Sequence, residues 1–379
     1  MYGLRRYFLL DPSVVFLNHG SFGATPRPVF QAFQRWQREL ERQPVEFLGR
    51  RFMDLMAGSR AALGAFLGTA ADNLVYTQNV TISINIVARS LELGAGDEVL
   101  TTDHEYGAMD RAWRFLSRER GFSYINQSVS LNSREDFLES FWRAVTPRTR
   151  VIFLSHITSP TAIIFPIEEV IQRARAAGIL TVIDGAHAPG QLPLDLDALG
   201  ADFYGGNLHK WLCAPKGAGF LYARPEVQPL LKPLVVSWGY EAEVPGPSLF
   251  VDHHEWWGTR DPAAFLSVPD AIEFQKMQDW DKVRAACHEL VREAEEQIRT
   301  LTGLPSLYPD DKWYCQLAAA PLAGSTDVQK LKTWLYDEHR IEVPIIDWHG
   351  RKFVRVSVQG YNTHREVDIL VHAIKAYPG

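Results

Sequence analysis

Lys210 and Asp184 are the residues whose types and surroundings most clearly suggest chemistry. Lys210 stands between a histidine and a tryptophan in a glycine-rich stretch, and Asp184 ends the apolar run 179–183. A lysine amine can form a Schiff base with a carbonyl cofactor, and a buried carboxylate can keep a pyridine nitrogen protonated. Together the two residues predict a pyridoxal phosphate site. Taken singly, each residue has a simpler explanation: Lys210 as a lysine on the surface, and Asp184 as the N-cap of a helix.

Two neighbouring segments meet the other needs of such a cofactor. His187 follows Asp184 by three positions and can donate to the phenolic oxygen of the cofactor, or be a loop histidine bonded to backbone. Residues 77–81 lead into the apolar stretch 82–88, which we expect to be helical. Since the first amides of a helix attract anions, this turn predicts a phosphate cradle. Thr81 is equally well explained as a simple N-cap, and the two roles are compatible.

A strand–helix–strand unit is predicted around these residues. Residues 151–155 and 179–184 are apolar runs typical of strands buried on both faces, and apolar positions at helical spacing lie between Pro166 and Gly178. Such a unit implies parallel strands joined by a right-handed crossover. Open α/β sheets bind ligands at the carboxyl ends of their strands, where Asp184 stands.

The rest of the pattern predicts two domains. Further strands are expected at 97–101 and 219–222, and the end of a helix at 85–93. From about residue 261 the pattern of apolar and polar residues changes. A long amphipathic helix is expected at 283–301, residues 352–357 alternate like a half-exposed strand, and Thr363 with Glu366 forms a capping-box signature. We therefore expect a large domain over 21–260, a smaller α+β domain over 261–379, and an N-terminal segment, 1–20, packed with the latter.

Bulk properties narrow the class of protein. The chain has 379 residues and a formal net charge of −6 without a basic tract, which argues against nucleic acid or an anionic membrane as partner. No apolar run approaches a membrane span, and the N-terminus lacks a signal-peptide pattern. Cys213, Cys287 and Cys315 have no paired spacing, so neither a disulfide framework nor a metal site is expected. These features predict a cytoplasmic enzyme.

The motifs, in the order in which they occur, resemble the class V aminotransferase family of fold-type I pyridoxal phosphate enzymes. Asp-x-x-His at 184–187, His-Lys at 209–210, the turn at 77–81 and Arg-Val-Ser with Tyr-Asn-Thr at 355–363 carry the resemblance, which runs from about residue 16 to 376. Segments 18–23 and 43–51 look most similar to the isopenicillin N epimerase branch. The family implies an α/β fold with a mostly parallel central sheet, a smaller α+β C-terminal domain and pyridoxal phosphate.

The resemblance also implies roles for single residues. Lys210 would carry the cofactor and serve as acid and base at the substrate Cα. Tyr106 would stack on the cofactor ring, with His104 as its competitor, and could donate a proton. Arg355 would bind the α-carboxylate as a fork, although on the pattern alone it is an exposed strand residue. The other implied cofactor contacts are Asp184 at the pyridine nitrogen, His187 and Ser159 near the phenolic oxygen, and Val80 (through its amide), Thr81, Asn207 and His209 at the phosphate.

Further implied contacts concern the substrate and a second subunit. The motif Asn18, His19, Gly20 is expected near the substrate. Thr259 resembles a threonine that reaches the phosphate of the neighbouring subunit, which implies a homodimer. Aromatic residues could wall the pocket or merely pack in the core, and a pair of arginines could meet a distal anion or be solvated: Phe22, Trp238, Trp256, Trp257, Arg50 and Arg51.

One departure from the family bears on the reaction. Cysteine desulfurases carry a nucleophilic cysteine on a loop before the carboxylate-binding arginine, and residues 342–351 contain none. Persulfide transfer is therefore not expected. An amino-acid substrate activated at Cα can be epimerised, can lose a β-substituent as in hercynylcysteine sulfoxide lyases, or can be transaminated. Epimerisation and β-elimination rank equally, ahead of transamination, and a non-catalytic regulator with the same fold is the remaining alternative.

Overall fold

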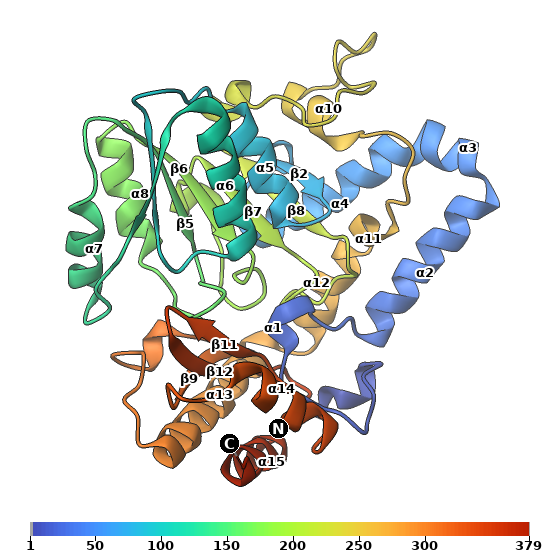
Figure 1. The fold of residues 1–379 in the computed structure, drawn as a ribbon. Coiled ribbons are helices and arrows are strands. Elements are labelled where there is room, and N and C mark those ends of the chain that lie inside the picture. The colour runs from blue at the N-terminus through green and yellow to red at the C-terminus, as the bar shows by residue number, and fades with distance from the viewer. Residues whose placement is uncertain (1–2, 379) are drawn as a thin grey trace.

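A computed structural model describes residues 3–378, and its larger part is built around a seven-stranded sheet (Figure 1). The strand order is β2-β8-β7-β6-β5-β3-β4. β8 pairs antiparallel with β2 and β7, whereas all other neighbours in this sheet are parallel. The strands are β2 (Leu74–Thr77), β3 (Glu98–Thr102), β4 (Ser123–Gln127), β5 (Thr149–Ser155), β6 (Leu180–Gly185), β7 (Phe203–Asn207) and β8 (Gly219–Ala223).

The sheet is covered by helices on both faces because its strands are apolar on both faces. In β5, Val151 and Phe153 belong to one core and Ile152 and Leu154 to the other, as the alternation of side chains along a strand requires. Helices α5 and α6 cover the face seen in front in Figure 1. The helices of this part are α2 (Arg27–Arg42), α3 (Pro44–Glu46), the π-helical η2 (Phe47–Arg51), α4 (Phe52–Leu67), η3 (Ala71–Asn73), α5 (Val80–Ser90), α6 (Gly107–Arg120), α7 (Arg134–Trp142), α8 (Ile167–Ala176), α9 (Leu196–Leu199), η4 (Pro225–Leu230), α10 (Leu249–Glu255), α11 (Ala263–Leu266) and α12 (Val268–Met277).

The predicted strand–helix–strand unit is confirmed as β5, α8 and β6, with the two strands parallel. The structure excludes two of the alternatives that the sequence left open. Helix α5 is capped by Asn79, whose side chain accepts from Ile82 N at 3.1 Å, so Thr81 is a residue of the first turn and not the N-cap. Asp184 does not cap a helix either, because it lies within β6.

The smaller part packs three helices on a three-stranded antiparallel sheet of order β11-β12-β9. The predicted capping box is present at the start of its last helix, where Thr363 and Glu366 bond reciprocally. The prediction that residues 352–357 form a half-exposed strand was wrong. Residues 353–357 of β12 are all buried, because β12 is the central strand of its sheet and one of its faces turns toward the larger part. The elements are α13 (Trp280–Thr302), η5 (Asp311–Trp313), β9 (Leu317–Leu322), α14 (Val328–Asp337), β10 (Ile341–Glu342), β11 (Ile345–Trp348), β12 (Arg351–Ser357) and α15 (His364–Ala376).

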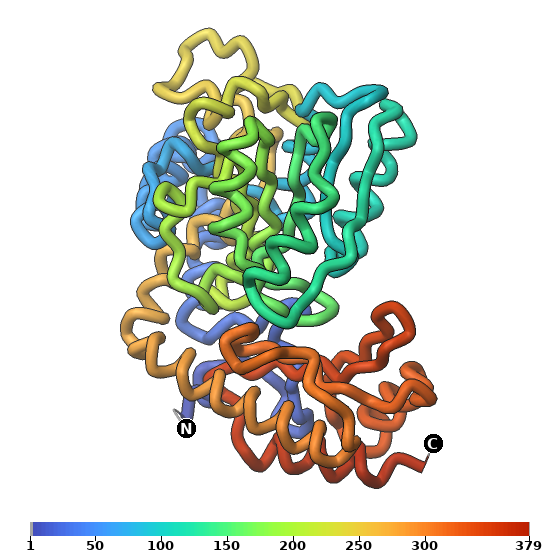
Figure 2. The backbone as a smooth tube through the Cα atoms, turned by 90° about the vertical axis from the view of Figure 1, so that its left-hand side faces the viewer, coloured from blue at the N-terminus to red at the C-terminus, as the bar shows by residue number. Residues whose placement is uncertain are grey.

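The N-terminal residues lie beside the smaller part before the chain enters α2 (Figure 2). After η1 (Leu4–Tyr7), strand β1 (Val15–Phe16) pairs in parallel with β10, and the short helix α1 (His19–Phe22) follows. This path brings residues 18–23 between the two parts of the molecule. Across residues 3–378, no helix combines the length and apolarity needed to cross a bilayer.

Candidate active site

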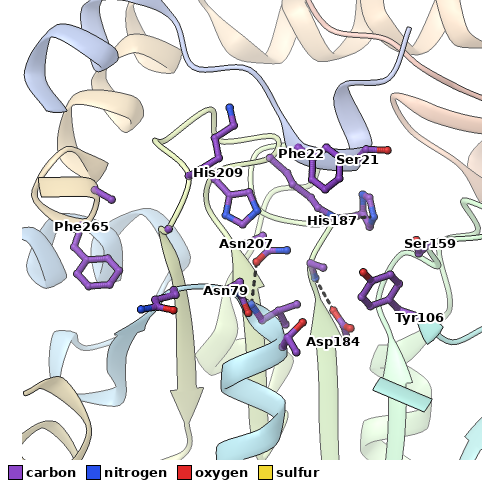
Figure 3. A pocket seen from close by; sticks show the side chains of 18 of the residues that line it. Ser21, Phe22, Asn79, Tyr106, Ser159, Asp184, His187, Asn207, His209 and Phe265 are labelled. Carbon is purple, nitrogen blue, oxygen red and sulfur yellow. Dashed lines mark hydrogen bonds between the residues drawn. The ribbon is translucent and has the colours of Figure 1, made fainter. Parts of the chain in front are cut away.

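A cavity of about 660 Å³ lies where the carboxyl ends of β5, β6 and β7 meet α1 and the start of α5 (Figure 3). It brings together residues that are up to about 240 positions apart, and most of the predicted cofactor contacts line it. The lining residues are Ser21, Phe22, Phe33, Gln78, Asn79, Val80, Thr81, Tyr106, Ser155, Ile157, Ser159, Asp184, Ala186, His187, Asn207, His209, Lys210, Lys216, Gly217, Arg260, Asp261, Ala264 and Phe265.

Lys210 reaches the cavity from the loop that follows β7. Its Nζ lies 3.0 Å from Nε2 of His187, and Nδ1 of His187 accepts from the indole N–H of Trp211 at 3.2 Å. Because Nδ1 is an acceptor, the proton of the neutral imidazole is on Nε2, facing the lysine amine. Burial, helped by the charge of Arg355 and opposed by Asp184, lowers the pKa of Lys210 to about 7. A large share of this amine is therefore neutral and nucleophilic near neutral pH.

The backbone of Lys210 is held by the N-terminal segment. His19 is fully buried between Tyr361, whose hydroxyl lies 2.9 Å from Nδ1, and the carbonyl of Lys210, 3.0 Å from Nε2. Burial lowers the pKa of His19 to about 3, so its neutral ring can donate from Nε2 to that carbonyl. Gly23, with φ +70°, packs so closely that a Cβ would come within 2.0 Å of the His209 carbonyl oxygen. The segment thus clamps the lysine loop from outside.

Asn18, His19 and Gly20 do not line the cavity, although the sequence suggested substrate contact. Asn18 donates to Glu342 at 3.0 Å and accepts from Ser21, and a Cβ on Gly20 would lie 3.1 Å from Ser357 Oγ. Their neighbours Ser21 and Phe22 line it instead. The motif therefore has a clear structural part in fixing α1 and the lysine loop.

Asp184 is a buried carboxylate at the floor of the cavity. Its Oδ1 accepts from the Ala186 amide at 2.9 Å (Figure 3). Burial raises the pKa of this carboxyl, against that hydrogen bond and the charge of Lys210. A cationic N–H placed against Asp184 would reverse the shift, since an opposite charge favours the ionised form.

The start of α5 and the residues after β7 form the other end of the site. Val80 N donates to Oδ1 of Asn207 at 2.9 Å, so Asn207 fixes the helix start and the Val80 amide is engaged. His209 directs Nδ1 to the carbonyl of Ala218 at 3.1 Å, and burial lowers its pKa to about 4. Its Nε2 is the ring nitrogen left for the cavity. An anion there would favour the charged ring, and Thr81 adds a first-turn position of α5.

Tyr106 and His104 lie in different places. Tyr106 lines the cavity next to Ser159 (Figure 3). His104 is buried elsewhere, with Nδ1 2.8 Å from the Thr161 hydroxyl and its ring centroid 4.2 Å from that of Trp348. Packing of this kind removes His104 from contact with a molecule in the cavity.

Arg355 lies directly behind the cavity wall and is buried, not exposed. Its Nη1 donates to the carbonyl and hydroxyl of Ser159 at 2.5 and 3.2 Å, and Nη2 donates to Ser21 at 3.2 Å. Both serines line the cavity. Burial lowers the pKa of Arg355 to about 10, which leaves it charged at neutral pH.

Several candidates from the sequence lie elsewhere among the described residues. Thr259 is exposed on the loop after α10 and does not line the cavity, Trp238 is 83% exposed, and Trp256 packs on Phe52 with ring centroids 4.8 Å apart. Arg51 pairs with Glu39 at 2.7 Å. The three cysteines are free, and burial raises the pKa of each thiol to about 12.

The sequence did not single out four residues that line or support the cavity. Lys216 and Arg260 are cations of the lining, Phe265 is an aromatic wall, and Glu105 lies behind the site, with its pKa raised to about 7 by burial. Lys216 stands six positions after Lys210, and Arg260 directly follows the pair Gly258-Thr259. Closeness in sequence to these motifs was the only signal that could have indicated Lys216 and Arg260.

A reactive lysine at the carboxyl edge of a mostly parallel sheet, aimed at a cavity with a buried carboxylate and a helix start, defines an α/β enzyme that binds a carbonyl cofactor. The model of the family "Aminotransferase class-V" matches residues 15–370, so the chain belongs to the class V aminotransferases, which use pyridoxal phosphate.

Similar proteins span almost the whole chain. Isopenicillin N epimerase of Amycolatopsis lactamdurans is 36% identical, over 98% of this chain and 97% of that protein. Hercynylcysteine sulfoxide lyase of Schizosaccharomyces pombe is 24% identical, over 99% and 97%. A solved structure of a C-DES mutant with glycine linked to its pyridoxal phosphate superposes with a TM-score of 0.86 at 22% identity, covering 98% and 99% of the two chains, and shares the fold.

The residues present fit pyridoxal phosphate. Asp184 is buried with a raised pKa, and a cationic partner such as the pyridine N–H of the cofactor would favour its ionised form. The helix start at Thr81 and the free Nε2 of His209 suit a phosphate, and the neutral amine of Lys210 suits an aldehyde. The chain is therefore a pyridoxal phosphate enzyme that acts at the Cα of an amino acid by epimerisation or β-elimination chemistry.

Proposed function

We propose that this enzyme epimerises an amino-acid substrate at Cα, with Lys210 and Tyr106 as the two groups that exchange the proton. The observation that carries the proposal is their separation: Lys210 follows β7 and Tyr106 follows β3, with β6 and β5 between them in the sheet, yet both line one cavity. Inversion needs a proton taken on one side and returned on the other. The 36% identity to an isopenicillin N epimerase supports this choice.

Each proposed role follows from the chemistry of this chain's residues. Pyridoxal phosphate, when bound, supplies a carbonyl group and an electron-accepting ring that makes the α-hydrogen of the substrate acidic. Asp184 binds the protonated pyridine nitrogen, and His187 and Ser159 contact the phenolic oxygen. Thr81 and His209 hold the phosphate, with Asn207 and Val80 fixing the helix start. Lys210, with a pKa lowered to about 7, takes the α-proton at Nζ.

Arg355 is proposed to bind the α-carboxylate of the substrate. Its two Nη atoms now donate to Ser159 and Ser21, both of which line the cavity. A carboxylate that entered between these serines could accept both N–H groups in the fork geometry that arginine favours. Asn18, His19 and Gly20 then act on the substrate indirectly, by holding Ser21 and the lysine loop.

β-Elimination with C–S cleavage is the second candidate, supported by 24% identity to a hercynylcysteine sulfoxide lyase over 99% of the chain. It needs the same α-proton removal but no proton return to Cα. The hydroxyl of Tyr106 is therefore dispensable for β-elimination and required for epimerisation.

Incubation in D₂O with a panel of L- and D-amino acids tests the proposal. Epimerisation gives α-deuterated substrate of inverted configuration, and Tyr106→Phe should abolish inversion while α-exchange by Lys210 persists. Pyruvate and ammonia without inverted substrate would replace the proposal with β-elimination, and the keto acid of an unchanged side chain would indicate transamination. Absence of exchange with every amino acid would favour a non-catalytic, cofactor-binding regulator.

We also propose that the active unit is a homodimer in which Thr259 reaches the phosphate bound by the partner. Thr259 is exposed, and the neighbouring segment 234–249 exposes large apolar side chains that water does not favour. In Figures 1 and 2 this segment is the yellow loop that projects from the larger part. Sedimentation at micromolar concentration should give twice the chain mass of 42.9 kDa, and a monomer carrying full activity would contradict the dimer.

Two further expectations are kept as proposals. Residues 21–260 and 261–379 are proposed to be the two domains, with 1–20 attached to the second. Helices α11 and α12 would then be the segment of the second domain that packs against α2 and α4 of the first. Limited proteolysis near residue 260 tests this division. A cytoplasmic location is proposed because three unpaired thiols persist best in a reducing compartment. Cell fractionation with an antibody to the native protein tests the location.

A further inference from the structure

Arg260 is a charged residue of the cavity for which the roles above provide no partner. It follows Thr259 and lines the cavity together with Asp261 and Phe265. Nε and Nη1 of its guanidinium are buried and have no hydrogen-bond partner among the described residues, while Nη2 donates to the carbonyl of Glu255 at 2.5 Å. Buried N–H groups of a charged fork are costly to leave unpaired.

Aromatic rings hold the guanidinium in place. The rings of Phe52, Trp257 and Phe265 lie 5.7, 5.4 and 5.4 Å from its Cζ, which is the distance of cation–π contacts. Such packing fixes the orientation of the side chain but provides no hydrogen-bond acceptor for Nε or Nη1. Arg260 is therefore preorganised for an acceptor that comes from outside this chain's fixed contacts.

The nearby carboxylates make no hydrogen bond to Arg260. Oε2 of Glu255 pairs with Arg60, whereas its Oε1 has no hydrogen-bond partner among the described residues and attracts Arg260 only at longer range. Asp261 accepts from the Ala263 amide at 2.8 Å through one oxygen and from Gln37 at 2.9 Å through the other. Neither carboxylate bonds to Arg260, so this side of the cavity carries a cation with unfilled donors.

Its position is distinct from the site of the α-carboxylate. Phe265, which contacts Arg260, lies at one side of the cavity, and Tyr106 and Ser159 lie at the other, with Asp184, Asn207 and His209 between them (Figure 3). Ser159 bonds to Arg355, the proposed carboxylate fork. A single extended ligand would have to span the cavity to meet both arginines.

We propose that Arg260 binds an oxyanion at the distal end of the substrate, so that the enzyme acts on an extended amino acid carrying a second negative charge. The inference rests on the proposed function for its reading of Arg355. In a planar guanidinium the parallel pairs of N–H groups are Nε with Nη2 and Nη1 with Nη2. Nη2 has a second N–H besides the one donated to Glu255, so a carboxylate can accept one of these pairs. The cofactor phosphate offers the same chemistry, and binding experiments separate the two sources.

The test compares S-(3-carboxypropyl)-L-cysteine with its neutral analogue S-(3-carbamoylpropyl)-L-cysteine, by calorimetry on the holoenzyme. The carboxylate should bind at least about tenfold more tightly, the ratio expected for one charged hydrogen-bonded pair. Arg260→Met, which keeps apolar bulk against the three rings, should reduce this preference to within about twofold. Arg260→Lys should retain part of it, because it keeps the charge and loses the fork.

The controls make the result decisive. Arg118→Met removes an exposed charge on α6 and should leave the preference unchanged. The cofactor dissociation constant of Arg260→Met should stay within about twofold of the native value. Weakening of cofactor binding by about tenfold or more would assign Arg260 to the phosphate and overturn the proposal. No preference in the native enzyme, or a preference that survives in Arg260→Met, would overturn it too.

The test still gives an answer if Arg260→Met misfolds or if the enzyme is not an epimerase. If Arg260→Met does not fold, as circular dichroism would show, Arg260→Lys decides, and an undiminished preference in that variant overturns the proposal. Calorimetry needs no turnover, so the inference survives a failure of the epimerase proposal. That failure would appear separately, as absence of α-deuterium exchange with any amino acid.

Discussion

The charge environment of Lys210 can be tested through the pH at which the apoprotein takes up pyridoxal phosphate. Burial and the charge of Arg355 lower the pKa of Lys210 from 10.5 to about 7, and Asp184 opposes the change. The neutral amine is the nucleophile, so uptake should rise with pH and reach half its maximum near pH 7. At pH 6 about a tenth of the amine is neutral, whereas an ordinary lysine has less than about one part in a thousand even at pH 7.

Two substitutions should move that midpoint in opposite directions. Arg355→Gln removes a positive charge that disfavours the protonated amine, so the midpoint should rise. Asp184→Asn removes a negative charge that favours the protonated amine, so the midpoint should fall. Arg118→Gln, an exposed charge on α6, should leave it in place. Comparison of variants at equal pH cancels the ionisation of the cofactor itself.

Stopped-flow absorbance between about pH 5 and 9, roughly two units on either side of the midpoint, measures the uptake rate. Borohydride followed by mass spectrometry should place the cofactor on Lys210, and Lys210→Ala should take up none covalently. A native midpoint at about pH 9 or above would refute the lowered pKa. Shifts of the two variants in the same direction would refute the electrostatic account.

Three further outcomes are expected. Gly23→Ala should destabilise the protein by more than about 2 kcal/mol and weaken cofactor uptake, because the new Cβ would collide with the His209 carbonyl at a positive φ. Gly58→Ala, in open space on α4, is the matched control. Equal melting temperatures for the two variants would contradict the proposed role of Gly23 in holding the lysine loop. Tyr106→Phe should keep cofactor affinity while Tyr106→Ala weakens it by about tenfold, as absorbance titration would show, since ring stacking requires only the aromatic face; equal affinities would count against stacking. Iodoacetamide at neutral pH should leave activity intact because burial raises the pKa of Cys315 to about 12, and rapid inactivation would point to a cysteine nucleophile after all.

The local order of elements could be predicted because it depends on periodicity. The apolar runs of β5 and β6 needed burial on both faces, and the helical spacing between them left only a crossover helix. Thr363 with Glu366 predicted a capping box from two residue types at fixed spacing, and the box is present. Such features arise from contacts between residues close in the chain.

The failures concern residues whose environment is set by distant segments. Alternation made β12 look half-exposed, but the polar side of that strand faces the larger part, where Arg355 bonds to Ser159 and Ser21. Thr81 suited an N-cap as well as Asn79 did, and only the observed backbone distinguishes them. Burial by a second part of the molecule leaves no periodic trace in the strand it covers.

The order of its chemical groups along the chain determined that this protein would present a lysine, a carboxylate and a helix start at one edge of a parallel sheet. Strand polarity places the residues that follow each strand at that edge, so their spacing suffices. Only the tertiary structure decided which aromatic enters the cavity, why the segment before α2 clamps Lys210, and that Arg260 lies there with unfilled donors. These depend on packing between segments hundreds of residues apart, which no local pattern encodes.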